Sequence, residues 1–214
     1  MKTLVAFLIF FCFNSFAQQI LYVDRMNYYY RNDLGGRNDI YYYLPSITYF
    51  GKAEKLGIEG SRGLKIIYEK RNSGGRYKGG ICGFITGVRA PPRGYQNLTP
   101  YKYISFWVRG EKGGENFNLG IADRAHFEKG STYRSLPVNR YVSDEIITTK
   151  WKQAFVPMEY FKVNWNEIET ITINFDSYVF ENGEGEGVIY LDDLAFYSEI
   201  PKYLEVQKEY PLVP

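Results

Sequence analysis

Apolar and polar residues alternate along five short segments in the second half of the chain, and Gly, Pro, Asn or Asp bounds each segment. Such alternation places one side of a β-strand in a core and the other side in water. Several short strands at this spacing, with no convincing helical pattern between them, predict an all-β sandwich or barrel. The five segments are residues 101–110, 116–123, 150–161, 169–180 and 188–197.

The first half of the chain carries fewer strand-like segments, at residues 21–26, 63–71 and 78–87. Between the first two of them, residues 27–46 are rich in Tyr, Asn, Asp and Gly, which predicts a long structured loop or a loose hairpin. Residues 122–146 form the one long connection expected among the later strands. The chain shows no internal repeat and no second domain.

Strand parity separates the inward from the outward side chains of three central segments. The apolar set of each segment is expected to face the core, and the other set is expected to face out. The inward sets are Ile104, Phe106 and Val108; Phe117, Leu119 and Ile121; and Ile171, Ile173 and Phe175. The outward sets are Tyr103, Ser105, Trp107 and Arg109; Asn118, Gly120 and Ala122; and Thr170, Thr172, Asn174 and Asp176.

The first residues of the chain have the composition of a secretory signal peptide, predicted over residues 1–17. Lys2 supplies a positive charge, residues 4–13 an apolar run, and residues 15–17 a cleavage site of the A-x-A kind. The run is shorter than the roughly 20 residues of a membrane-spanning helix, and it breaks at Asn14. A buried N-terminal strand would not explain this order of lysine, apolar run and small residues.

Cleavage would leave a secreted or periplasmic chain, with one β-sandwich domain over residues 18–197 and a charged tail over 198–214. Cys82 would then be the only cysteine, so no internal disulfide is expected. A composition of 45% hydrophobic and 23% charged residues suits a single globular domain with a sizeable core. The net charge is +2 and no basic block stands out, which argues against nucleic acid as a partner.

Four segments of the chain follow one another in a distinctive order. In the second segment Trp151 precedes the sequence Val156-Pro157-Met158, and the last segment carries the paired aspartates Asp192 and Asp193. The four segments are residues 113–123, 147–161, 168–175 and 187–197. This order resembles the non-catalytic carbohydrate-binding modules with the galactose-binding-like jelly-roll fold, which are often attached to bacterial endoglucanases. The resemblance spans roughly residues 20–197. It implies an all-β, two-sheet antiparallel β-sandwich that binds a polysaccharide or oligosaccharide.

The resemblance also implies a structural calcium ion at an edge of the sandwich. Its ligands would include Asp24 and an aspartate of the last-strand pair, Asp193 or Asp192, with backbone carbonyls and Asn27 completing the shell. The sequence departs from the family pattern beside Asp24, where Arg25 stands in place of a second acidic residue. The alternative is that the paired aspartates form a turn or bulge, where their carboxylates accept hydrogen bonds from the N–H groups of a loop.

An outer face that mixes Trp, Arg, Asn and Asp side chains is suited to hold a sugar, because aromatic rings pack on pyranose faces while polar groups bond the hydroxyls. Trp107 is the best single candidate for the aromatic platform, and packing under a loop is its equal alternative. The residues predicted to contact a glycan are Trp107, Arg109, Asn174 and Asp176, with His126 and Tyr133 at a loop rim.

A small carbohydrate-active enzyme on the same sandwich is the first alternative. A glycoside hydrolase needs two carboxylates roughly 5–9.5 Å apart, and no spacing in the sequence pairs any two candidates. A polysaccharide lyase would use His126, Tyr133 and Arg124. A further alternative is a cell-surface assembly protein, and a module of this class can also serve a separate catalytic protein. The candidate carboxylates are Glu115, Asp123, Glu128 and Asp176.

Overall fold

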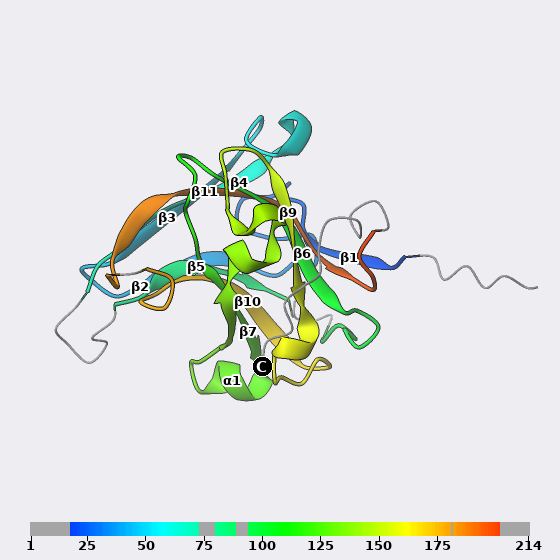
Figure 1. Cartoon of the computed structure of the whole chain (residues 1–214). Coiled ribbons are helices and arrows are strands. Elements are labelled where there is room, and N and C mark those ends of the chain that lie inside the picture. Colours follow the sequence, from blue (N-terminus) through cyan, green and yellow to red (C-terminus); the bar gives the residue numbers. More distant parts are fainter. Residues whose placement is uncertain (1–17, 73–79, 89–93, 181, 202–214) are drawn as a thin grey trace, which may run out of the picture.

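A computed structural model describes residues 18–72, 80–88, 94–180 and 182–201, and in these residues the protein is an antiparallel β-sandwich (Figure 1). The predicted all-β, two-sheet class is confirmed. The expected signal peptide, residues 1–17, and most of the expected tail lie outside the described residues.

The first layer is a sheet of six strands in which every pairing is antiparallel. Its order is β3-β4-β11-β6-β9, and β1 pairs with β11 beyond the point where β4 ends. Tyr197, at the end of β11, therefore pairs with both β1 and β6. The strands are β1 (Ile20–Asp24), β3 (Ile47–Ala53), β4 (Gly63–Lys70), β6 (Tyr103–Gly110), β9 (Lys152–Pro157) and β11 (Gly185–Tyr197).

The second layer is a sheet of five strands in the order β2-β5-β10-β7-β8, also antiparallel throughout. In Figure 1 it lies below the first sheet, with α1 at its lower end. Its central strand, β10, pairs with β5 on one side and β7 on the other. The strands are β2 (Asn38–Tyr42), β5 (Cys82–Gly87), β7 (Asn118–Asp123), β8 (Tyr133–Pro137) and β10 (Ile168–Phe175).

Short helical turns connect the strands. They are α1 (Arg124–Glu128) and the 3-10 turns η1 (Ile58–Gly60), η2 (Val138–Tyr141), η3 (Ser143–Glu145) and η4 (Met158–Tyr160). The helix α1 begins where the Asp123 side chain accepts a hydrogen bond from the His126 N–H, which satisfies one of the free donors of the first turn. None of the helices among the described residues is long and apolar enough to cross a membrane.

The core lies between the two sheets, and the inward sets predicted by parity are confirmed as buried. Phe106 of β6 and Phe117, just before β7, are almost fully buried with ring centroids 5.9 Å apart. Tyr68 and Phe175 stack from opposite sheets at 3.8 Å. Burying a ring of this size contributes about 1.5–3 kcal/mol, so these aromatic contacts across the layers hold the sandwich together.

The pattern predicts neither β3 nor β8 as a strand. The segment Ile47–Ala53 forms β3, although its inward positions include Thr48 and Lys52 in place of apolar residues. The expected long connection of residues 122–146 contains β8, whose five residues include only one large aliphatic side chain. Both strands are defined by pairing with distant segments, which local alternation does not reveal.

Candidate functional site

A groove of about 560 Å³ lies on the outer face of the five-stranded sheet. This volume is within the roughly 300–1,000 Å³ of small-molecule sites in proteins. Residues of all five strands, of α1 and of the segment that follows α1 line it. The lining residues are Ile40, Tyr41, Tyr42, Tyr43, Ile81, Ile85, Ala122, Phe127, Gly130, Ser131, Thr132, Arg134, Thr170, Thr172 and Asn174.

The floor of the groove is formed by alternate residues of β10, and the three that face it are Thr170, Thr172 and Asn174. Thr172 Oγ1 donates to Asn174 Oδ1 at 3.0 Å. The Tyr41 hydroxyl donates to the same amide oxygen and lies 3.2 Å from the carbonyl of Ile173. Asn174 Nδ2 in turn donates to the Asn118 carbonyl at 3.3 Å. These contacts fix the amide, so the floor is polar, nearly buried and of set orientation.

Two glycines make this array possible. A Cβ at Gly83 would lie 2.4 Å from the Tyr41 hydroxyl, so only glycine lets the Tyr41 ring cross β5 to reach β10. A Cβ at Gly120 would lie 2.3 Å from Thr172 Oγ1 and 2.7 Å from Thr132 Oγ1. Glycine at these positions therefore allows side chains of neighbouring strands to approach closely over the backbone.

One charged residue, Arg134 of β8, occurs among the described residues that line the groove. Its Nη1 lies 2.6 Å from Oδ2 of Asp176, which also accepts from Asn118 Nδ2 at 3.1 Å. Oδ1 of Asp176 accepts from the Tyr178 N–H at 2.9 Å. The buried carboxylate thus holds the guanidinium in place, and about a third of the Arg134 side chain stays exposed to the groove.

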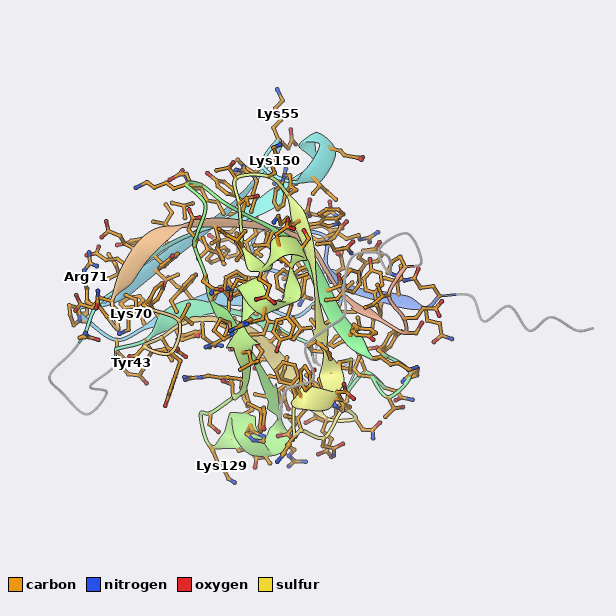
Figure 2. All side chains as sticks on the ribbon, viewed as in Figure 1. Tyr43, Lys55, Lys70, Arg71, Lys129 and Lys150 are labelled. Carbon is orange, nitrogen blue, oxygen red and sulfur yellow. The ribbon has the colours of Figure 1, made fainter. Side chains whose placement is uncertain are left out.

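Exposed rings stand at the two ends of the groove. Tyr42 and Tyr43 follow one another at the end of β2, with 47% and 46% of their surface exposed, and Phe127 of α1 is 50% exposed. Figure 2 shows Tyr43 at the end of the molecule that also carries Lys70 and Arg71. Exposed rings beside a polar floor match the two needs of a sugar ring, an apolar face and hydrogen bonds at its rim.

The structure separates the predicted ligand residues into two groups on different sheets. Asn174 lines the groove, and Asp176 anchors Arg134 at its edge. Trp107 and Arg109 lie on β6 of the six-stranded sheet, where the Arg109 guanidinium stacks 3.7 Å above the Tyr190 ring. The expectation of one surface shared by all four residues is wrong, because β6 and β10 belong to opposite layers.

The two predicted rim residues also lie away from the groove lining. Tyr133 pairs with the inward residue Ile121 and packs edge-to-face on Phe161, so its ring points towards the core. His126 Nδ1 lies 2.7 Å from Oδ1 of Asp123 on the first turn of α1. Tyr133 lies on β8 and not in the predicted loop, and the side chain that does reach the groove is its neighbour, Arg134.

The Asp123 carboxyl has a structural role. Burial alone would raise its pKa, but hydrogen bonds from the backbone N–H groups of Asn164 and His126, and from the His126 ring, bring the pKa below its usual value. A carboxylate with several donors is stabilised in its charged form. Asp123 therefore caps α1 and ties it to the segment before β10.

None of the four candidate carboxylates lines the groove. Asp176 is paired with Arg134, and Asp123 caps α1. Glu128 is exposed and lies 2.9 Å from Arg124 on the same helical turn. Glu115 lies in a separate hollow of about 630 Å³, where the chain leaves β6. The structure therefore brings no two of them together across the groove.

The expected calcium ligands occupy one end of the sandwich, but as arranged they do not fit a calcium ion. Every oxygen of Asp24 and Asp192 accepts a hydrogen bond, and the ammonium of Lys52 contacts Asp24. Asp193 sits in a bulge of β11 at φ 49°, where burial and the neighbouring Asp192 raise its pKa to about 6. Asn27 is exposed. The described residues contain no cluster of three or more His, Cys, Asp or Glu suited to a metal.

The family profile of carbohydrate binding domain 30 matches residues 53–198, which is more than half of the chain. The chain therefore belongs to this family of carbohydrate-binding modules. The matched segment contains β4 to β11 and thus most of the groove, while β2 and its tyrosines precede it.

Solved structures show the same fold at low sequence identity. The family 11 carbohydrate-binding module of a cellulosomal cellulase of Clostridium thermocellum has a TM-score of 0.60 at 12% identity, covering 84% of this chain and 95% of the module. The family 30 module of another cellulosomal cellulase of that organism has a TM-score of 0.59 at 13% identity, covering 83% and 96%. No curated protein matches the sequence.

Proposed function

We propose that this protein is an exported, non-catalytic module that binds a β-glucan chain in the groove of the five-stranded sheet. One observation carries the proposal: exposed rings stand at the ends of a groove whose polar floor is fixed, and no carboxylate is present among the described lining residues. Such a surface can hold a neutral sugar chain by stacking and hydrogen bonding, but it lacks the acid pair of a glycoside hydrolase.

The binding chemistry follows from the position of each group. The rings of Tyr43 and Phe127 offer apolar faces to pyranose C–H groups, and Thr170 is the floor residue with the most exposed surface for a sugar hydroxyl. The Arg134 guanidinium donates to ring or hydroxyl oxygens, since it has five donors and Asp176 engages only part of them. Contacts spread along an open groove give weak affinity for each sugar unit and higher affinity for a polymer.

The ligand class is supported by a structural neighbour. A family 11 module from Clostridium thermocellum is described in complex with a β-1,3-1,4-mixed-linked tetrasaccharide, and it shares this fold with a TM-score of 0.59 at 12% identity. The N-terminal sequence supports export to the periplasm or beyond the cell. Its partner besides the glycan would be a separate catalytic or cell-surface protein.

Affinity electrophoresis tests the proposal. The protein is run through native gels that contain barley β-glucan, lichenan, xylan or mannan, and we expect retardation in the β-glucan gels. Reducing-end and unsaturated-product assays on the same polymers are expected to show no turnover. Unchanged mobility in every gel would contradict glycan binding, and accumulation of products would favour the enzyme alternative.

A further inference from the structure

A buried ion pair occupies the end of the sandwich where the family resemblance places a metal. Lys52 of β3 reaches inward, and its side chain is fully buried, while that of Asp24 at the end of β1 is only 2% exposed. The Lys52 Nζ contacts Oδ2 of Asp24. A buried ammonium is costly to desolvate, so one at this position requires a specific partner.

Two further donors are directed at the Asp24 carboxylate. Oδ1 accepts from the Met26 N–H at 2.7 Å, and Oδ2 accepts from Asn38 Nδ2 at 3.0 Å in addition to the ammonium. Calcium binds six to eight oxygen atoms at about 2.3–2.6 Å, and each of them must point a lone pair at the ion. Three donors take up three of the roughly four lone-pair directions of this carboxylate, and one of the three is itself a cation, which takes the place of an ion at Oδ2.

Asp192 on β11 shows the same arrangement. Oδ2 of Asp192 accepts from the Ile58 N–H at 3.0 Å and from Ser61 Oγ at 2.6 Å, and Oδ1 accepts from the Asp193 N–H at 2.9 Å. A Cβ at Gly57 would lie 2.3 Å from Oδ2, so the loop around η1 closes directly onto the carboxylate. The loop therefore holds the Asp192 carboxyl through these donors, which offset part of the rise that burial causes in its pKa.

We propose that the Lys52 ammonium is the built-in cation of this end of the sandwich, and that the folded protein uses no calcium ion here. The ammonium neutralises Asp24 and joins β1 to β3 across 28 residues of sequence. Because the charge is covalently part of the chain, the stability of this end does not change with the calcium concentration. A domain of this kind stays folded beside polymers or chelators that remove divalent cations.

Thermal unfolding of the full chain tests the proposal, with circular dichroism recorded in excess EDTA and in millimolar calcium chloride. We expect the same unfolding midpoint in both solutions. Lys52→Met removes the ammonium and leaves a buried, uncompensated carboxylate, which is expected to lower the midpoint by roughly 6–20 °C. Lys55→Met is the matched control, because Figure 2 shows Lys55 extending away from the body of the protein, and it is expected to change nothing.

The double variant Asp24→Asn with Lys52→Met separates charge from packing. It removes both charges, so it is expected to recover part of the midpoint lost in Lys52→Met, and it remains informative if the single variant fails to fold. A saturable rise of the wild-type midpoint with calcium, reversed by EDTA and absent in Asp24→Asn, would overturn the proposal. Equal midpoints for Lys52→Met and Lys55→Met would overturn it as well. The readout is unfolding, so it does not depend on glycan binding.

Discussion

Nη1 of Arg134 lies 2.6 Å from Oδ2 of Asp176, and this pair joins β8 to the residue that follows β10. The carboxylate is almost fully buried, whereas the guanidinium faces the groove. Since Asn118 and the Tyr178 N–H hold Asp176 from other directions, the anion is fixed independently of Arg134. The pair therefore holds a cationic hydrogen-bond donor in a fixed position at the edge of the groove.

Arg134→Ala is expected to weaken β-glucan binding roughly tenfold, or about 1.4 kcal/mol, because it removes a charged hydrogen-bond donor. Isothermal titration with a mixed-linkage oligosaccharide measures the change. The matched control is Arg109→Ala, which removes the same side chain from the other sheet and is expected to leave the affinity unchanged. The opposite ranking of the two variants would place the binding surface on the six-stranded sheet.

Gly120→Ala is expected to reduce both glycan affinity and stability. The new Cβ would lie 2.3 Å from Thr172 Oγ1 and 2.8 Å from Asn174 Nδ2, so the floor of the groove must shift. Overpacking of this kind costs about 1–3 kcal/mol, measurable by urea denaturation. Gly51→Ala is the control, because its Cβ meets nothing within 4 Å and its stability is expected to stay close to wild type. Equal effects of the two substitutions would refute the close approach at residue 120.

The stability contributed by Asp123 is expected to depend on pH. The pKa of its folded-state carboxyl is below the usual value, so the contribution is fully present above the unfolded pKa and is lost as pH falls through the folded one. Asp123→Asn is expected to cost about 1 kcal/mol at neutral pH, the typical value of a helix N-cap. Urea denaturation at pH 7 and below pH 4 should show the difference from wild type shrinking in acid. A constant difference, or the same behaviour in the exposed control Glu54→Gln, would contradict this role.

Cys82 is expected to be unreactive in the folded protein. It is buried, and burial raises the pKa of its thiol, so little thiolate is present or accessible at neutral pH. A chain that begins at Gln18 should react with Ellman's reagent only after urea is added, and then at one site. Rapid labelling of the native protein at pH 7 would show that the thiol is exposed.

The sequence by itself determined the strands with regular alternation and their inward faces. Ile104, Phe106 and Val108 are buried as parity predicts, because alternation is a local property of extended backbone. The same rule correctly predicted that Thr172 and Asn174 face away from the core. The order of residues in the second half was also sufficient to predict the class of module.

The tertiary structure alone decided which sheet each strand joins and thus which outward residues share a surface. Trp107 and Asn174 are both outward by parity, yet they lie on opposite layers, because pairing depends on partners far away in the chain. The strand of Arg134 has too few apolar positions to be seen locally. Lys52 faces inward only because Asp24, 28 residues away, neutralises it, and no local pattern contains that contact.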